Sequence, residues 1–506
     1  MNASPLTGRI AAAPSDLLNE EVLRPQFDFD AAWLLPWYVR AEKVLLTEYV
    51  RMGLLSMSQA QAIEALLDTV DPSALAADPR FNMSDLAFAL ERFVLERLPE
   101  PVPRWHVDRS RNDLQACAHL LFCRERLRAT AHTLLACFEA GHQLASRHAD
   151  TPMPGYTHLQ PAQVMTPGFY MAGLTGQLLH SLRRLSSVYE GTEGNPLGAG
   201  AMAGQELDWD RERIASLLGF TAAHPHPLTA VASRSWALEA AAEASHLGVA
   251  LSRFVTDLMA WTSGAYQFAE LPDELAGISS AMPQKKNYPV LERIRGRTAH
   301  LTAAYLGIAT TQRATAFSNS VEVAKEGGTQ LHGLFDTLQS TLRLLTSVLE
   351  HLRFSPDRMR AACESEYLGG FSLANELTLR ADVPWRTAQV IAGRYIVHAL
   401  ERGLAPDRPC SALLADVAEG QGVRLSDPGS LLERGLGPER GLYGKQRSGS
   451  THPAAVRALL ERQSSDAAVL AADWRAREER TERAAASVDR ELGLRAHRES
   501  SGTGAV

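Results

Sequence analysis

Five long stretches with helical periodicity dominate the middle of this chain and limit the folds that it can adopt. In each stretch apolar residues recur at steps of three and four, as in amphipathic helices. The stretches are residues 113–148, 163–190, 233–268, 289–311 and 320–352. No alternation of apolar and polar residues of useful strand length appears anywhere. The sequence therefore predicts an all-α protein with a long central helical bundle.

Shorter helical patterns flank the bundle. They fall at residues 27–53, 58–70 and 84–98 before it, and at 356–364, 372–380, 387–402 and 453–462 after it. Gly- and Pro-rich loops begin near residue 353, which predicts a change of domain there. The expected domains are an N-terminal helical domain (1–108), the central bundle (109–353) and a C-terminal helical domain (354–506). We expect loose order up to about residue 25 and partial disorder from about residue 476, where small and charged residues prevail.

The composition restricts the partners. With 45% hydrophobic and 22% charged residues, the chain resembles an ordinary globular protein. A net charge of −7 argues against a nucleic-acid partner, and no run approaches the roughly 20 apolar residues of a membrane span. Five cysteines without zinc-ligand spacing, and a start without a signal-peptide core, favour a cytoplasmic protein with no metal site. The alanine-rich, broadly apolar helix faces predict an oligomer.

One loop, residues 277–287, carries unusual chemistry between two long helical patterns. It reads Gly-Ile-Ser-Ser-Ala-Met-Pro-Gln-Lys-Lys-Asn. Serine offers a base or nucleophile, lysine a fixed positive charge, and asparagine a two-way hydrogen-bonding group. Only five of the 51 basic residues are lysines, and two of them are adjacent here, which argues against a generic polar surface turn.

A second polar segment, residues 104–113, lies directly before the first long helical stretch. Ser110 and Asn112 would then lie at a helix N-terminus, where backbone amides favour a bound anion. A helix cap with surface arginines is an equally good interpretation of this segment alone.

The order of these motifs resembles the aspartase/fumarase superfamily, and most closely the argininosuccinate lyases. Residues 279–287 are similar to its signature loop, and Asp108–Asp113 to its Gly-Arg-Ser-Arg-Asn-Asp motif. Residues 153–160 match its Thr-His-Leu-Gln motif, and residues 196–201 resemble its glycine-rich segment. Ile278 and Tyr288 depart from the family's glycine and proline, and Asp108 from its glycine.

The resemblance implies an activity and an assembly. Members of this family cleave a C–N or C–O bond by anti elimination and release fumarate, without a metal or organic cofactor. They form homotetramers around a twenty-helix core, with each active site built from three subunits. We therefore expect a homotetrameric lyase that acts on a small N-succinyl compound.

The resemblance also implies roles for individual residues. Ser279 would remove the proton beside a succinyl carboxylate, and Lys285 and Asn287 would bind that carboxylate as it gains charge. His158 would lie near the departing nitrogen, oriented by Glu292. The succinyl group would be held by Ser110, Arg111, Asn112 and Thr157, with Gln160 beside them.

The residues expected around the leaving amine differ from the family pattern. Aligned on Lys325, the family's tyrosine and glutamine are Phe317 and Glu322 here. The N-terminal helix lacks the family's polar pair and offers Trp37, Tyr38 and Glu42 in its place. These changes predict a lyase of specialised metabolism with an amine other than arginine.

Three alternatives stay open at this point. The chain could be a genuine argininosuccinate lyase that makes arginine and fumarate, a catalytically silent structural relative, or a helical scaffold with only an architectural likeness. The presence of Ser279, Lys285 and His158 argues against the last two.

Overall fold

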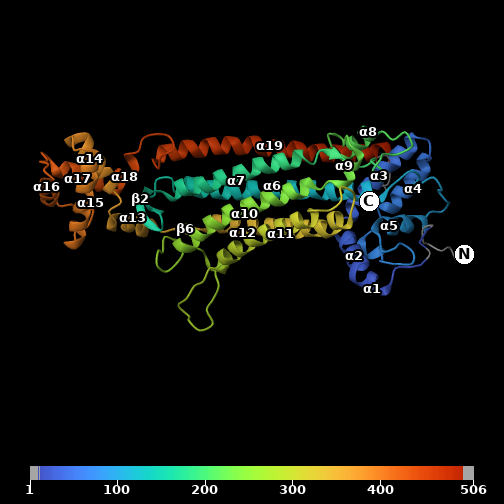
Figure 1. Ribbon diagram of the computed structural model, residues 1–506, viewed down its shortest axis with the longest axis horizontal. Helices are drawn as coiled ribbons and strands as arrows, with labels where there is room; N and C mark the ends of the chain where they lie inside the picture. The colour runs from blue at the N-terminus through green and yellow to red at the C-terminus, as the bar shows by residue number, and fades with distance from the viewer. Residues whose placement is uncertain (1–8, 11, 494–506) are drawn as a thin grey trace, which may run out of the picture.

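Five long helices lie along the longest axis of the molecule, in a computed structural model that describes residues 9–10 and 12–493. They are α6 (Arg111–Arg147), α7 (Pro167–Glu190), α10 (Ser235–Trp261), α11 (Pro289–Gln312) and α12 (Gly327–His351). Figure 1 shows them side by side in the middle of the molecule. The expected all-α fold and its central bundle are confirmed.

Leucines on the inward faces hold this bundle together. Leu127 and Leu144 of α6, Leu251 of α10, and Leu342 and Leu345 of α12 are fully buried. Each buried leucine side chain contributes about 2 kcal/mol. The periodicity that predicted the helices therefore also forms the core.

The N-terminal helices lie at one end of the bundle and share its core. They are α1 (Asp16–Leu18), η1 (Asn19–Leu23), α2 (Arg24–Trp33), α3 (Leu35–Arg51), α4 (Met57–Leu67), η2 (Pro72–Ala74) and α5 (Leu86–Leu95). The single helix predicted over 27–53 is two helices, because Pro36 lacks the N–H that a continuous helix would need. Residues 16–23 are helical, so the prediction of loose order was wrong there; residues 1–8 and 11 lie outside the described part.

A β-hairpin between α6 and α7 contradicts the expectation that the chain lacks strands. Strand β1 (Met153–Thr157) pairs antiparallel with β2 (Gln160–Met165), with Met153 opposite Met165. Pro154, Gly155 and Pro161 hide this hairpin from a search for alternating residues, since proline and glycine are poor strand formers. Two shorter pairs join β3 (Gly194–Asn195) to β4 (Ala222–Ala223) and β5 (Ala269–Glu270) to β6 (Arg353–Phe354).

The short helices after residue 355 gather at the other end of the bundle (Figure 1). They are α13 (Pro356–Ser365), α14 (Gly370–Ala381), α15 (Trp385–Glu401), α16 (Ser411–Glu419), α17 (Pro428–Leu436) and α18 (Pro438–Tyr443). Residues between Leu373 and Leu436 form a hydrophobic cluster of their own. The remaining short helices are α8 (Arg211–Leu218), α9 (Pro227–Ala232), η3 (Asp273–Leu275) and η4 (Glu322–Glu326).

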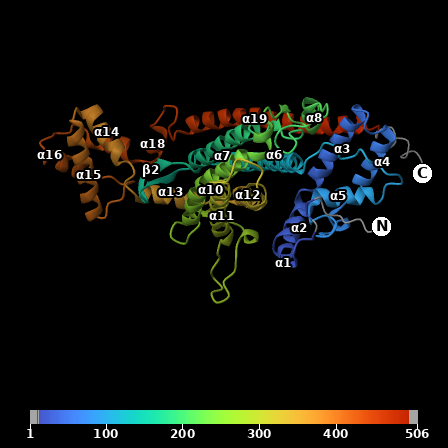
Figure 2. The ribbon, with the colours of Figure 1, turned by 45° about the vertical axis from the view of Figure 1, so that its right-hand side comes forward.

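The last helix, α19 (Pro453–Glu491), runs back along the whole bundle and packs on α6 and α7 (Figure 2). The predictions of a short helix at 453–462 and of disorder from residue 476 were therefore wrong up to residue 491. The charged residues of α19 conceal a buried stripe that includes Trp474 and Val488. Residues 494–506 lie outside the described part. None of the described helices is apolar enough over a sufficient length to cross a membrane.

Candidate functional site

The N-terminus of α6 gathers one group of the predicted site residues. Ser110 is the N-cap, and its hydroxyl accepts a hydrogen bond from the backbone N–H of Asn112 at 3.2 Å. The Asn112 side chain donates to the carbonyl of Ala201 at 3.1 Å and accepts from Asn319 at 2.9 Å. The glycine-rich segment and the loop before η4 therefore meet the motif here. No motif in the sequence pointed to Asn319.

Asp113 fixes the glycine-rich segment against α6. One oxygen of its buried carboxylate accepts the backbone N–H groups of Gly198 and Gly200, at 2.9 and 3.0 Å. Gly200 has a φ of +61°, and a Cβ there would lie 2.4 Å from the carbonyl oxygen of Gly204, so this turn requires glycine. Burial raises the pKa of Asp113 to about 6, although the two N–H groups oppose the rise.

Asp108, which replaces the family's glycine, adopts a φ of +60°. Its carboxylate accepts hydrogen bonds from the backbone N–H groups of Glu206 and Leu207 and from the indole N–H of Trp209. A single residue in this conformation costs of order 1 kcal/mol, which these three bonds offset. The substitution therefore ties the motif to the segment that precedes α8.

A cavity of about 510 Å³ opens beside this helix end and between two π-helical turns, η1 and η4. The ammonium of Lys325 in η4 lies 2.5 Å from a carboxylate oxygen of Asp30 in α2, and both residues line the cavity. Arg111 also lines it and pairs with Asp85 at 3.0 Å. Isolated π-helical turns occur frequently at functional sites. We call this space the amine-side cavity.

The structure corrects the expectation for the N-terminal helices. Glu42 is buried and receives two hydrogen bonds from Arg109, at 2.5 and 2.7 Å, so it holds the motif in place and does not face the cavity. Tyr38 is buried in the core. Asp30, one helix earlier, faces the cavity instead, and its spacing in the sequence did not distinguish it from a surface residue.

Phe317 and Glu322 lie outside the amine-side cavity. Phe317 is 63% exposed, and Glu322 is exposed at the first position of η4. Only Lys325, of the three residues predicted from this segment, lines the cavity.

The Thr157, His158 and Gln160 motif forms the tip of the β1–β2 hairpin. His158 and Leu159 have φ angles of +54° and +61°, the geometry of a tight type I′ turn. Neither residue is a glycine, so the turn holds a strained conformation of a kind that gathers at functional sites. Thr157, His158 and Gln160 are all exposed at this end of the molecule.

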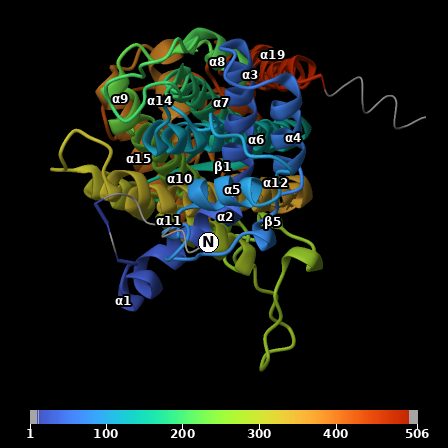
Figure 3. The ribbon, with the colours of Figure 1, turned by 90° about the vertical axis from the view of Figure 1, so that its right-hand side faces the viewer.

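The signature loop projects away from the helical body in all three views (Figure 3). Two backbone hydrogen bonds between Gly277 and Asn287, at 2.8 and 3.0 Å, close its base. At its start, the Ser279 hydroxyl accepts the N–H of Met282 at 3.1 Å. Lys286 pairs with Glu270 and Asp273, both at 2.9 Å, and these hydrogen bonds raise its pKa.

The two loop lysines therefore differ in their surroundings. Whereas Lys286 is held at the base of the loop, Lys285 is exposed and has no side-chain partner among the described residues. Glu292 is exposed in the first turn of α11, and no hydrogen bond or ion pair joins it to His158 within the described chain.

The Asn112 group lies far from both the hairpin and the signature loop in one chain. The Asn112 group is at the first residue of α6 and the hairpin follows its last, and the 37 residues of α6 span about 55 Å. The signature loop precedes α11, whose far end leads to Asn319, and its 24 residues span about 36 Å. No described group of three or more His, Cys, Asp or Glu side chains could hold a metal ion.

Comparisons with known proteins agree with the motifs. A family model described as "Lyase" matches residues 42–301. Argininosuccinate lyase of Chromobacterium violaceum is 31% identical over 466 residues, which cover 90% of this chain and 97% of that protein. Argininosuccinate lyase of Methanothermobacter thermautotrophicus is 30% identical over 407 residues, 80% of this chain and 87% of that one. The solved structure of an EDDS lyase variant with bound fumarate superposes with a TM-score of 0.84 at 26% identity, and the match covers 98% of this chain and 99% of that one.

Proposed function

This chain belongs to the argininosuccinate lyase-like group of the aspartase/fumarase superfamily and is a fumarate-releasing carbon–nitrogen lyase, and we propose that it cleaves an N-succinyl compound whose amine is not arginine. The observation that carries the proposal is the charge of the amine-side cavity. Its wall holds four carboxylates and two cations. The carboxylates are Glu21, Asp30, Asp85 and Glu326, and the cations are Arg111 and Lys325.

Both cations already have acidic partners. Lys325 pairs with Asp30 and Arg111 pairs with Asp85, so neither is free for the carboxylate of an amino acid. Glu21 and Glu326 leave the wall with a net negative charge. Such a wall attracts an ammonium group and repels a carboxylate that lies close to it. The charge of the wall therefore comes from these cavity residues, and Glu322, which lies outside the cavity, does not contribute to it.

The signature loop supplies the chemistry in this proposal. Ser279 removes the proton from the carbon beside a succinyl carboxylate, and the N–H of Met282 already points at its hydroxyl oxygen. A donated hydrogen bond favours the ionised form of such an oxygen. Lys285, without a partner in the described chain, stabilises the dianion that forms on the substrate, together with Asn287. His158 lies near the departing nitrogen of the substrate, and Glu292 orients its ring.

This mechanism requires more than one copy of the chain. Helices α6 and α11 hold the Asn112 group apart from the hairpin and from the signature loop, so residues that act on one substrate must come from different subunits. Exposed apolar side chains on the bundle helices, among them Val249 and Leu306, support such an assembly. We propose a homotetramer in which Asn112, His158 and Ser279 of different subunits face one substrate.

A panel of N-succinyl amines tests the proposed substrate class. Fumarate release is followed by the ultraviolet absorbance of its conjugated double bond, with Ser279→Ala as the inactive control. Fumarate release from N-succinyl derivatives of amines other than arginine, with little release from argininosuccinate, supports the proposal. Efficient cleavage of argininosuccinate supports the genuine argininosuccinate lyase instead, and no release from any compound supports a silent relative.

A further inference from the structure

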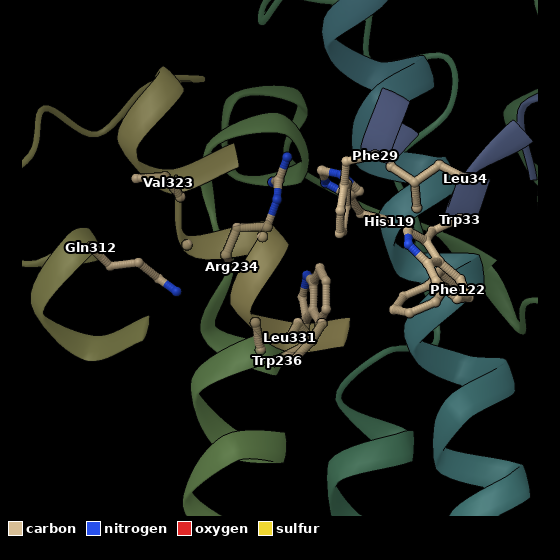
Figure 4. A pocket seen from close by; sticks show the side chains of 13 residues that line it. Phe29, Trp33, Leu34, His119, Phe122, Arg234, Trp236, Gln312, Val323 and Leu331 are labelled. Carbon is tan, nitrogen blue, oxygen red and sulfur yellow. The ribbon is translucent and has the colours of Figure 1, made fainter. Parts of the chain in front are cut away.

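A second cavity, of about 20 Å³, lies behind Phe29, which also lines the amine-side cavity. Figure 4 shows side chains from segments far apart in the sequence converging on it. Its walls are mainly aromatic. They include Phe29, Trp33, Phe122 and Trp236.

Arg234 brings the only charged side chain among the thirteen that line this cavity. It is 4% exposed and precedes α10 directly. Its Nη1 donates to the carbonyls of Val231 and Ser233, at 3.0 and 2.8 Å, which fixes the guanidinium. Its Nε and Nη2 have no hydrogen-bond partner in the described chain. Two N–H-bearing atoms of a buried cation therefore remain to be satisfied.

The charges around Arg234 leave it uncompensated. No aspartate or glutamate lines the cavity. Burial, with Arg234 and Lys325 nearby, lowers the pKa of His119 well below its usual range, so this ring is neutral. Burial lowers the pKa of Arg234 to about 10, which leaves it charged at neutral pH. A buried charge without a partner is costly, so an anion at this position would be strongly favoured.

Size and position restrict the anion. A single water needs roughly 10–15 Å³ of such space, so 20 Å³ admits a halide or a carboxylate head and excludes a larger group. His119, at the cavity, lies seven residues after Asn112 on the same face of α6, about 10 Å away. That separation is within the length of an extended amine half of an N-succinyl compound.

We propose that Arg234 and its aromatic cavity form a subsite for one small monovalent anionic group. The group is either a free halide ion or a carboxylate at the far end of the substrate's amine, beyond the negatively charged wall of the amine-side cavity. The second source rests on the proposed function, and the first does not.

Thermal unfolding in the presence of small anions tests the subsite without using activity. The full-length protein is titrated with sodium bromide or sodium formate, while a bulky sulfonate keeps the ionic strength constant. We expect the wild-type Tm to rise and saturate. Arg234→Met should show no rise, and without small anions it should unfold at the wild-type Tm or above. A wild-type protein without a saturable response would overturn the proposal.

Arg124→Met is the matched control, since Arg124 is 2% exposed but donates to the carbonyls of Thr192 and Gly219, at 3.1 and 2.8 Å. It should lower the Tm and keep the anion response. An unchanged response in Arg234→Met would contradict the assignment. Should Arg234→Met not fold, the anomalous signal of bromide in wild-type crystals decides: a peak beside Arg234 supports the subsite, and its absence there refutes it.

Kinetics then distinguish the two sources. If the substrate's carboxylate occupies the subsite, bromide competes with a carboxylate-bearing N-succinyl amine, and Arg234→Met raises KM for that compound by tenfold or more, without affecting one that lacks the carboxylate. If bromide raises the Tm but does not compete, the occupant is a free halide. The thermal result stands even if no N-succinyl compound is cleaved, so failure of the proposed function and failure of the subsite are distinguishable.

Discussion

The ammonium of Lys325 lies 2.5 Å from the carboxylate of Asp30, and this pair joins the π-helical turn η4 to helix α2 across the wall of the amine-side cavity. The carboxylate is almost fully buried and the lysine side chain is only 19% exposed. The pair therefore both shapes the cavity and removes a cation that an amino-acid carboxylate would otherwise use.

Asp30→Asn should destabilise the protein by about 2 kcal/mol, because it leaves a largely buried ammonium without its partner. Urea unfolding measures the change. The control is Asp28→Asn, an exposed position on the same helix, which should leave the stability unchanged. Equal stability of the two variants would show that the pair contributes nothing.

Ser279→Ala should lower the rate of fumarate release by roughly 10²–10⁴-fold, since it removes the proposed base. The Tm should not change, because Ser279 bonds only within the projecting loop. Ser280→Ala, next to it in the loop, should keep most of the activity. If Ser279→Ala works at a rate within a few-fold of wild type, serine is not the base.

Mixing two inactive variants tests whether the active site is shared between subunits. Asn112→Ala and Ser279→Ala affect residues that α11 holds about 36 Å apart in one chain. Unfolding the two together and refolding them should restore part of the wild-type activity, because some sites then receive both intact residues. Each variant refolded alone should stay inactive. Failure of every mixture would contradict an active site shared between subunits.

The raised pKa of Asp113 predicts that the stability of the protein changes with pH. Burial raises its pKa from 3.8 to about 6, so the folded protein binds this proton more tightly than the unfolded chain does. The resulting stabilisation is fully present below about pH 4 and is lost as the pH rises through about 6. Relative to Asp113→Asn, the wild-type free energy of unfolding should fall by about 3 kcal/mol between about pH 4 and about pH 7.

The exposed Asp416→Asn is the control and should follow the wild-type pH dependence. Urea unfolding at a series of pH values provides the comparison. A constant difference between wild type and Asp113→Asn across this range would mean that Asp113 does not titrate there.

The apolar periodicity predicted the fold correctly where it continued over a long stretch of the chain. The helices α6, α10 and α11 follow a clear apolar pattern, and the structure places them close to their expected positions. The β1–β2 hairpin could not be predicted in this way, because a type I′ turn with histidine and leucine at positive φ violates the usual turn preferences. The end of α19 was mistaken for disorder because its charged residues outnumber the buried ones.

The candidate site was predictable only as motifs. Ser110, Asn112 and Lys325 could be found from their order in the chain, and the structure brings them to one end of the bundle. Asp30 and Arg234 could not be found in this way, since a single charged residue in a helical pattern is expected at the surface unless its burial is known. Glu42 was expected near the leaving amine, but it pairs with Arg109. The two residues are 67 positions apart, and a contact over such a distance leaves no local pattern in the sequence.

The ratio of kcat/KM for argininosuccinate to kcat/KM for the best N-succinyl amine in the panel tests the central claim most directly. The proposed cavity charge predicts that an amine other than arginine is preferred by at least roughly 100-fold, and that argininosuccinate turns over well below about 1 per second. A kcat for argininosuccinate of that size or more, with no better substrate in the panel, would contradict the proposal and identify arginine as the leaving amine.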